Sequence, residues 1–364
     1  MKLLIIINSL ATGGAEKIVC DSLLGFTERG IQVDLLLLNG KRTPFLDKLG
    51  SLRVGTIHII KHIHIYNPLI IFKIIPFLKK ADLVHVHLFP SLYWVAFAKL
   101  ISFSKTPLVF TEHSTVNRRR KFLFFRFVDR FIYKQYHAII TISTEVKLFL
   151  KKHLELKNSY FKTIHNGVDL SVFQNAIALD KKQFKIKKEE KILIQVARFT
   201  KEKDYETLLK SIPFVDKPIK LLLVGNGPLQ IKMKELAQIL EIEEKVLFLG
   251  IRQDVPALLK MADIAILSSN HEGLSLFGIE AMASGKPLIA SKVSGLSTLV
   301  HGAGLLFKHK DYLDLAKNIN QLLDSEVFYK SITESCIHRS KIYSLDKLID
   351  AHVQFYTQLC AKTN

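Results

Sequence analysis

Two acidic side chains, Glu272 and Glu280, are separated by seven residues in a segment that follows an apolar run. Ser275 is a suitable N-cap for a helix that ends near Ser284, and Gly285 is a suitable stop for it. The backbone N–H groups and the dipole of such a helix start favour a bound diphosphate. Glu272 would then lie in the loop, and Glu280 could accept hydrogen bonds from ribose hydroxyls. The simpler interpretation is two solvated carboxylates around an ordinary capped helix.

A pair of glycines, Gly13 and Gly14, follows the first apolar run of the chain. The missing side chains would let the backbone approach a phosphate or a sugar closely, although turns need glycine too. Neither G-x-G-x-x-G nor G-x-x-x-x-G-K-[ST] occurs in the sequence. Their absence argues against a dehydrogenase and a P-loop ATPase.

Short apolar runs that do not alternate predict the strands that must position these residues. They are rich in Ile, Leu and Val, as expected of strands buried on both faces of a parallel sheet. The runs cover 3–7, 33–38, 83–86, 108–110, 138–142, 192–196, 220–224, 246–249, 264–267 and 287–290. Helical patterns lie between several of them, for example over 15–29, 205–212 and 228–240, which indicates doubly wound α/β domains.

The length of 364 residues favours two such domains. We expect an amino-terminal domain over 1–170, a second domain over 171–345, and a helix over 346–364 that packs back on the first domain. A polar stretch over 168–190 contains the boundary. Ligands of open parallel sheets bind at the carboxyl ends of the strands, so every loop after a strand is a candidate site.

Several segments in order resemble glycosyltransferase family 4, a family of retaining enzymes. The strongest is the segment with Glu272 and Glu280, which continues as A-M-A-S-G-K-P-L-I-A. The others are 8–16 (NSLATGGAE), 85–87 (HVH), 111–114 (TEHS), 164–169 (IHNGVD), 196–204 (VARFTKEKD) and 223–228 (LVGNGP). The resemblance implies the GT-B fold, in which two Rossmann-like, doubly wound parallel-sheet domains face a central cleft.

The resemblance also implies roles for individual residues. Arg198 and Lys203 would neutralise the donor diphosphate as it leaves, and His113 would contact the donor sugar rather than act as a general base. Without the resemblance, a lone histidine after a strand is more often structural. The expected catalytic residues are His113, Glu272, Arg198 and Lys203. The expected donor site comprises Gly13, Gly14, Arg198, Lys203, Gly225, Asn226, Arg252, Glu272, Gly273, Leu274, Ser275, Leu276 and Glu280. Ser9, Thr12 and His87 are weaker candidates for the acceptor side.

One position departs from the family. Thr298 stands where many relatives have a glutamate, so donor preference or helix capping is in doubt there. We expect no cofactor and no metal, because no cluster of Asp or His has metal-ligand spacing and the nucleotide sugar is a substrate.

The positive charge is concentrated in the first half of the chain. Residues 1–170 contain 25 basic and 11 acidic side chains, and the formal net charge of the whole chain is +19. The stretch from Arg118 to Lys134 predicts a basic amphipathic helix that could contact an anionic membrane surface; alternatively, its apolar side packs into the domain. Its cations are Arg126, Arg130 and Lys134, and its apolar stripe is Phe124, Phe127, Val128, Phe131 and Ile132. Residues 57–80 are a second candidate surface.

The three cysteines are far apart in the sequence and form no C-x-x-C pair, and there is no leader pattern and no run long enough to span a bilayer. These features favour a cytoplasmic protein. Together with the basic helix, they lead us to expect it at the inner face of the cytoplasmic membrane.

The leading hypothesis is transfer of a hexose or N-acetylhexosamine from a nucleotide sugar, UDP-linked, to a lipid-linked or growing glycan of a bacterial surface polysaccharide. A sugar-nucleotide 2-epimerase of the same fold is the alternative. The hypothesis of a non-enzymatic nucleic-acid-binding protein is supported by charge alone, so we expect no nucleic acid as a partner.

Overall fold

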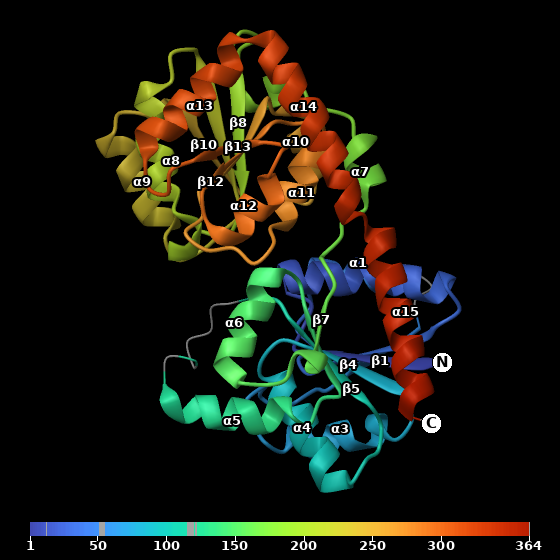
Figure 1. Cartoon of the computed structure of the whole chain (residues 1–364). Helices are drawn as coiled ribbons and strands as arrows, with labels where there is room; N and C mark the ends of the chain where they lie inside the picture. The colour runs from blue at the N-terminus through green and yellow to red at the C-terminus, as the bar shows by residue number, and fades with distance from the viewer. Residues whose placement is uncertain (12, 51–54, 115–119, 121, 364) are drawn as a thin grey trace. The chain divides into compact units, whose positions relative to one another are not determined.

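The computed structural model of the chain describes residues 1–11, 13–50, 55–114, 120 and 122–363. The chain forms two compact units, Met1–Gly167 with Leu345–Asn364, and Val168–Ser344. The predicted boundaries, 170/171 and 345/346, lie within three residues of these divisions. The carboxyl-terminal helix thus belongs to the same unit as the amino terminus (Figure 1).

Unit 1 contains a seven-stranded parallel sheet of order β3-β2-β1-β4-β5-β6-β7. Its strands are β1 (Lys2–Ile7), β2 (Gln32–Leu37), β3 (Thr56–Ile59), β4 (Leu83–His87), β5 (Leu108–Glu112), β6 (Ala138–Thr141) and β7 (Phe161–Thr163). Two groups of helices cover it. One group is α3 (Ile70–Leu78), α4 (Ser91–Ser102), α5 (Leu123–Tyr133) and α6 (Thr144–Leu154), and the other is α1 (Gly14–Glu28), α2 (Pro44–Gly50) and α15 (Leu345–Thr363).

Unit 2 contains a six-stranded parallel sheet of order β10-β9-β8-β11-β12-β13. Its strands are β8 (Lys191–Val196), β9 (Ile219–Val224), β10 (Val246–Gly250), β11 (Ile264–Leu267), β12 (Leu288–Ser291) and β13 (Leu305–Phe307). Its helices form two groups. One group comprises α8 (Tyr205–Ser211), which packs on both α9 (Gln230–Ile239) and α13 (Tyr312–Asp324), and the other comprises α7 (Leu170–Gln174), α10 (Val255–Met261), α11 (Leu276–Ala283) and α14 (Glu326–Ser340). In addition, α12 (Ser294–Val300) packs on β12 and β13. The predicted α/β class and the ten predicted strands are confirmed.

Three strands, β3, β7 and β13, were not predicted from the sequence. Each has only three or four residues and lies at an edge of its sheet, where one side has no neighbouring strand. Edge strands are commonly short, and the three-residue runs of β7 and β13 are too short to show a pattern. In β3 the polar Thr56 and His58 interrupt the apolar run.

Alternate residues of the unit 1 strands face opposite layers. Val84 and Val86 of β4 pack in the apolar cluster with α3 to α6. His85 and His87 therefore point to the other face, which α15 covers. There the Tyr356 hydroxyl lies 2.6 Å from His85 Nδ1. The end of the chain thus packs directly against the middle strand of unit 1, beside α1 (Figure 1).

The predicted basic amphipathic helix is observed as α5, although 118, 119 and 121 of the basic run before it lie outside the described residues. The alternative in which its whole apolar side packs inward is wrong for three residues. Phe124, Phe127 and Phe131 are 71%, 74% and 51% exposed, whereas Ile132 is fully buried. The Arg126 and Arg130 guanidinium groups pair with the carboxylate of Glu155, so part of the cationic charge is compensated.

The search for membrane-spanning helices found none among the described residues. Cys20, Cys336 and Cys360 are free thiols, and burial raises the pKa of both Cys20 and Cys336 to about 11.

Three buried histidines and the half-buried His113 should make unit 1 acid-sensitive. Burial lowers the pKa of His113 and His352 to about 4, and lowers those of His85 and His87 well below the usual range. An unfolded chain binds these protons near pH 6.5, so this stability is fully present above pH 6.5 and falls as the pH drops toward 4.

We predict that Trp94 fluorescence, which reports on unit 1 because the chain has one tryptophan, shows lower denaturant midpoints as the pH falls through this window. His352→Phe removes one titrating ring. Between pH 7 and pH 4, the free energy of unfolding of this variant should therefore fall by about 3 kcal/mol less than that of the wild type. An identical pH dependence for the variant and the wild type would contradict the assignment.

Candidate active site

The order of strands reverses at one point in each sheet. In unit 1 the reversal lies between β1 and β4, and in unit 2 it lies between β8 and β11. The loops after two such strands run to opposite faces of the sheet and leave a crevice at their carboxyl ends. The loops after β1, β4, β8 and β11 contain most of the candidate residues.

The loops after β8 and β11 are joined by hydrogen bonds. The Ser268 hydroxyl donates to the Lys203 carbonyl oxygen at 3.0 Å. The Asn270 amide N–H donates to the Glu202 carbonyl at 2.7 Å, and its side-chain Nδ2 donates to the Lys201 carbonyl at 2.7 Å. The residues 201–203 form one turn of 3₁₀-helix whose carbonyl groups are thereby satisfied. These contacts fix the position of the loop after β8 relative to the loop after β11.

The side chains of Lys203 and Glu272 form an ion pair at this junction. The Lys203 ammonium contacts Glu272 Oε1, and the Ser269 hydroxyl donates to the same oxygen at 3.1 Å. The two side chains are 24% and 12% exposed. Within the described part of the chain, Glu272 Oε2 has no hydrogen-bond partner and the exposed Arg198 has no ion pair. The site therefore offers one anchored carboxylate with a free oxygen, and one unpaired guanidinium.

The helix after β11 starts and stops where the sequence predicted. Ser275 is the N-cap, and its hydroxyl accepts from the Gly278 N–H at 3.3 Å. The helix ends before Gly285, whose φ is +73°. Gly273 and Leu274 precede the cap, and Leu276 is the first helical residue. Glu280 lies in the second turn and is 6% exposed, so it is not a solvated surface carboxylate.

Two glycines let neighbouring loops approach this region. A Cβ on Gly295, in the first turn of α12, would lie 2.2 Å from the Glu272 carbonyl oxygen. A Cβ on Gly225 would lie 2.1 Å from the Ala197 carbonyl oxygen, and the φ of Gly225 is +132°. The carbonyl of Asn226 accepts a hydrogen bond from the Phe199 N–H at 3.2 Å, which holds the loop after β9 against the loop after β8.

Arg252 is not brought to the switch point. It follows β10, the edge strand that lies two strands from β8. Its guanidinium donates two hydrogen bonds to Asp254, at 2.8 and 2.5 Å, and these raise the pKa of Arg252. The unusual Thr298 lies on the exposed side of α12, where its hydroxyl contacts the Ser294 carbonyl at 3.4 Å.

In unit 1, Asn8 joins the loops after β1 and β4. Its Nδ2 donates to the Phe89 carbonyl at 2.7 Å, and its Oδ1 accepts from the Ser91 hydroxyl at 2.6 Å. In the sequence, Asn8 is only the first residue of the 8–16 segment, and nothing local indicates this role. Ser9 is half-buried beside it. Gly13 is the N-cap of α1 with extended backbone and Gly14 is the first residue of the helix; Thr12 lies outside the described residues.

A chain of aromatic contacts leads from α15 to His113. His85 lies between the Tyr356 hydroxyl and the Thr111 hydroxyl, each at 2.6 Å. Its ring centroid is 4.1 Å from that of His87, and His87 Nδ1 lies 3.0 Å from His113 Nε2. One of these two nitrogens must donate and the other accept. Because burial lowers the pKa of His113 to about 4, the ring is neutral near pH 7 and leaves Nδ1 for a ligand.

Glu112, next to His113, points away from it into a buried polar cluster that the sequence did not predict. Its carboxylate pairs with Arg120 and accepts a hydrogen bond from the Tyr133 hydroxyl at 2.8 Å. Arg120 also lies 4.0 Å from the fully buried Asp129. This arginine therefore holds α5 on β5 and is not part of an exposed basic surface.

Within the described residues, no group of three or more His, Cys, Asp and Glu side chains could hold a metal ion.

Two family models match the chain. "Glycosyl transferases group 1" matches residues 177–339, and "Glycosyltransferase Family 4" matches residues 12–172. Together these ranges include every candidate residue except Ser9.

Three curated relatives illustrate the range of similarity. N-acetyl-α-D-glucosaminyl L-malate synthase of Bacillus anthracis is 32% identical over 207 residues, 55% of this chain and 54% of that protein. UDP-Gal:α-D-GlcNAc-diphosphoundecaprenol α-1,3-galactosyltransferase of Escherichia coli is 26% identical over 67% of each chain. N-acetylgalactosamine-N,N′-diacetylbacillosaminyl-diphospho-undecaprenol 4-α-N-acetylgalactosaminyltransferase of Campylobacter jejuni is 24% identical over 95% of this chain and 97% of that one.

The match spans about half the length of several relatives, 54%, 44% and 48% of three of them. Solved structures agree over the whole chain. Anabaena HepE in complex with UDP and glucose has a TM-score of 0.86 at 20% identity, covering 98% of this chain and all of that one. Sucrose-phosphate synthase of Thermosynechococcus elongatus has a TM-score of 0.83 at 20% identity, covering all of both. The chain belongs to the family 4, group 1 glycosyltransferases and has their GT-B fold.

Proposed function

We propose that this glycosyltransferase moves a hexose or N-acetylhexosamine, with retention, from a UDP-sugar to a lipid-linked or growing glycan acceptor. The product would be an intermediate of a bacterial surface polysaccharide such as O-antigen, capsule or exopolysaccharide. The observation that carries the proposal is the junction of the β8 and β11 loops. There Arg198 is unpaired and Glu272 is anchored by Lys203 with one oxygen free.

The names of the relatives support the finer parts of the proposal. The E. coli relative is named for a UDP-Gal donor, and both it and the C. jejuni relative are named for diphosphoundecaprenol-linked acceptors. All three quoted relatives are named for an α-linked sugar. Since UDP-hexoses of this kind are α-linked, an α-linked product corresponds to retention.

The chemistry needs charge stabilisation more than acid or base groups. The bond from C1 of the sugar to the diphosphate breaks, the acceptor oxygen bonds to C1 on the same face, and the acceptor proton passes to the departing phosphate oxygen. Arg198 and the ammonium of Lys203 stabilise the growing negative charge of the diphosphate. The Gly273–Ser275 loop and the N-terminus of α11 add backbone donors.

The carboxylates hold the sugar and the ribose in this proposal. Glu272 Oε2 accepts a hydrogen bond from a sugar hydroxyl, while Oε1 keeps Lys203 in place. Glu280 accepts from the ribose hydroxyls. His113, neutral and held by His87, contacts the donor sugar through Nδ1. Gly13, Gly14, Gly225 and Asn226 complete the donor contacts, and Ser9 with His87 faces the acceptor. No metal is needed because the cations are side chains.

The acceptor would bring the enzyme to the inner face of the cytoplasmic membrane. The exposed Phe124, Phe127 and Phe131 of α5 form an apolar strip that suits peripheral contact with an anionic bilayer. Exposed Tyr66, Leu69 and Phe72 lie within the second surface considered from the sequence, residues 57–80.

We predict that Arg198→Ala lowers kcat/KM for transfer by roughly 100-fold or more, since one preorganised charge on the leaving group is lost. The free energy of unfolding should change by less than about 0.5 kcal/mol, because Arg198 is exposed and unpaired. Lys201→Ala removes an equal charge from the same loop and is the matched control for Arg198→Ala. Separately, Glu280→Gln, which keeps the buried volume, should raise the KM for the donor. Equal rates for Arg198→Ala and Lys201→Ala would refute the assignment.

The Lys203–Glu272 pair should behave as a unit. Lys203→Gln and Glu272→Gln should each lower kcat/KM strongly, and the double variant should be no slower than the slower single variant. Each variant is measured with the same donor and acceptor, and its fold is checked by circular dichroism. Fully additive losses in the double variant would mean that the two residues act independently.

A further inference from the structure

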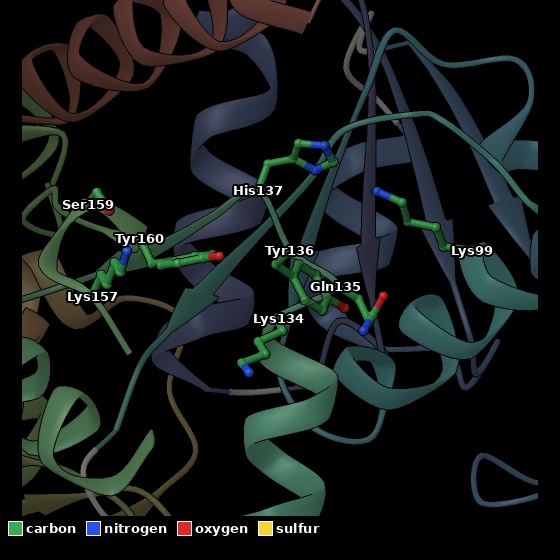
Figure 2. A pocket seen from close by; sticks show the side chains of 8 residues that line it. All are labelled: Lys99, Lys134, Gln135, Tyr136, His137, Lys157, Ser159 and Tyr160. Carbon is green, nitrogen blue, oxygen red and sulfur yellow. The ribbon is translucent and has the colours of Figure 1, made fainter. Parts of the chain in front are cut away.

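A polar cavity lies in unit 1 at the strand ends opposite to His87 and His113. It has a volume of about 600 Å³. β6 begins directly after His137 and β7 directly after Tyr160, so these lining residues mark the amino ends of the strands. Figure 2 shows the lining side chains, which come from the end of α4, the link before β6 and the turn before β7. They are Lys99, Lys134, Gln135, Tyr136, His137, Lys157, Ser159 and Tyr160.

The cavity is cationic and contains no carboxylate among its lining residues. In the described part of the chain, none of Lys99, Lys134 and Lys157 forms an ion pair within 4.0 Å. Burial lowers the pKa of Lys99 to about 8, and burial together with the nearby Lys99 lowers the pKa of His137. Both directions are those of cations that lack a negative partner. An anion in the cavity would reverse both effects.

The lining presents donors rather than acceptors. The backbone N–H of Leu108 donates to His137 Nδ1 at 3.2 Å. The neutral ring must therefore have its proton on Nε2, which makes that nitrogen a donor. Lys99 extends into the space from one side and the Tyr160 ring from the other (Figure 2). Ammonium, imidazole and hydroxyl donors around one space suit a group with several acceptor oxygens, as a phosphate has.

Apolar side chains lie next to this cavity in the chain. Ile101 and Phe103, two and four residues after Lys99, are 49% and 89% exposed. Phe131, three residues before Lys134 on α5, is also exposed. Lysines beside exposed aromatics are typical of surfaces that bind anionic lipids.

We propose that this cavity binds the phosphate of an anionic phospholipid, with Phe103 and Phe131 in contact with the acyl region beside it. This rests on the peripheral membrane contact proposed above and adds a specific headgroup site, distinct from the donor and acceptor sites. A soluble phosphate compound would meet the same donors, so the test has to separate the two sources.

The reactivity of the lining lysines toward acetylation measures occupancy of the cavity directly. The whole protein is treated with acetic anhydride alone, with phosphatidylcholine vesicles, with vesicles that also contain phosphatidylglycerol, and with soluble glycerol phosphate, and each lysine is quantified by mass spectrometry. Phosphatidylglycerol vesicles should protect Lys99, Lys134 and Lys157 several-fold, and leave Lys187 and Lys188, exposed in unit 2, as reactive as before. Equal protection by glycerol phosphate at the same concentration would overturn the lipid source. Protein that sediments with the vesicles without protection of these lysines would overturn the site while leaving the membrane contact intact.

Affinity measurements give the second readout. Lys99→Gln/Lys157→Gln should weaken binding to phosphatidylglycerol vesicles at least roughly tenfold more than Lys105→Gln/Lys162→Gln, because bonds to the phosphate are lost in addition to surface charge. The control pair removes two exposed lysines of unit 1 that do not line the cavity. Lys157→Gln alone, at an exposed residue, covers the case that the Lys99 change impairs folding. Transfer to a soluble acceptor should be unchanged in all variants. Equal losses of vesicle affinity in both double variants would mean that the lysines of the cavity act only through general surface charge, and would overturn the proposal.

Discussion

The ion pair between Lys203 and Glu272 is the interaction on which the geometry of the candidate site depends. It joins the loop after β8 to the loop after β11, the two strands at which the order of the sheet reverses. A partly buried ion pair is costly to desolvate, and it is stable only when further hydrogen bonds satisfy its members. The Ser269 hydroxyl supplies one such bond, to Glu272 Oε1. Asn270 holds the two loops together beside the pair through its bonds to the carbonyl groups of Lys201 and Glu202. Gly295 allows α12 to lie against the same loop.

The candidate residues of unit 1 are neutral histidines, whereas those of unit 2 include charged side chains. His113 is held by His87, and the neighbouring His85 is held by Tyr356 from the last helix of the chain. Burial keeps these rings uncharged near pH 7, so they can orient hydroxyl groups without binding phosphate strongly. A division of this kind suits a reaction in which one partner is a diphosphate and the other is a sugar hydroxyl.

Local sequence signals predicted what depends on local interactions. Apolar runs located ten of the thirteen strands of the described residues, and Ser275 and Gly285 marked the ends of α11 because caps act within one helical turn. Long-range contacts were not predicted. Lys203 was expected on a diphosphate, and only the folded chain shows that it pairs with Glu272. Arg120 read as part of a basic run, but it is buried against Glu112. Nothing local in the sequence links Tyr356 to His85, which are 271 residues apart.

The proposed activity is transfer of a sugar with retention through a donor site on the β8 and β11 loops. The most direct test is nuclear magnetic resonance of the product formed from a UDP-α-hexose and a diphosphate-linked acceptor. We expect an α-anomeric product whose formation requires the acceptor and persists in the presence of a metal chelator. A β-linked product, or a donor epimerised at C2 without any acceptor, would contradict it.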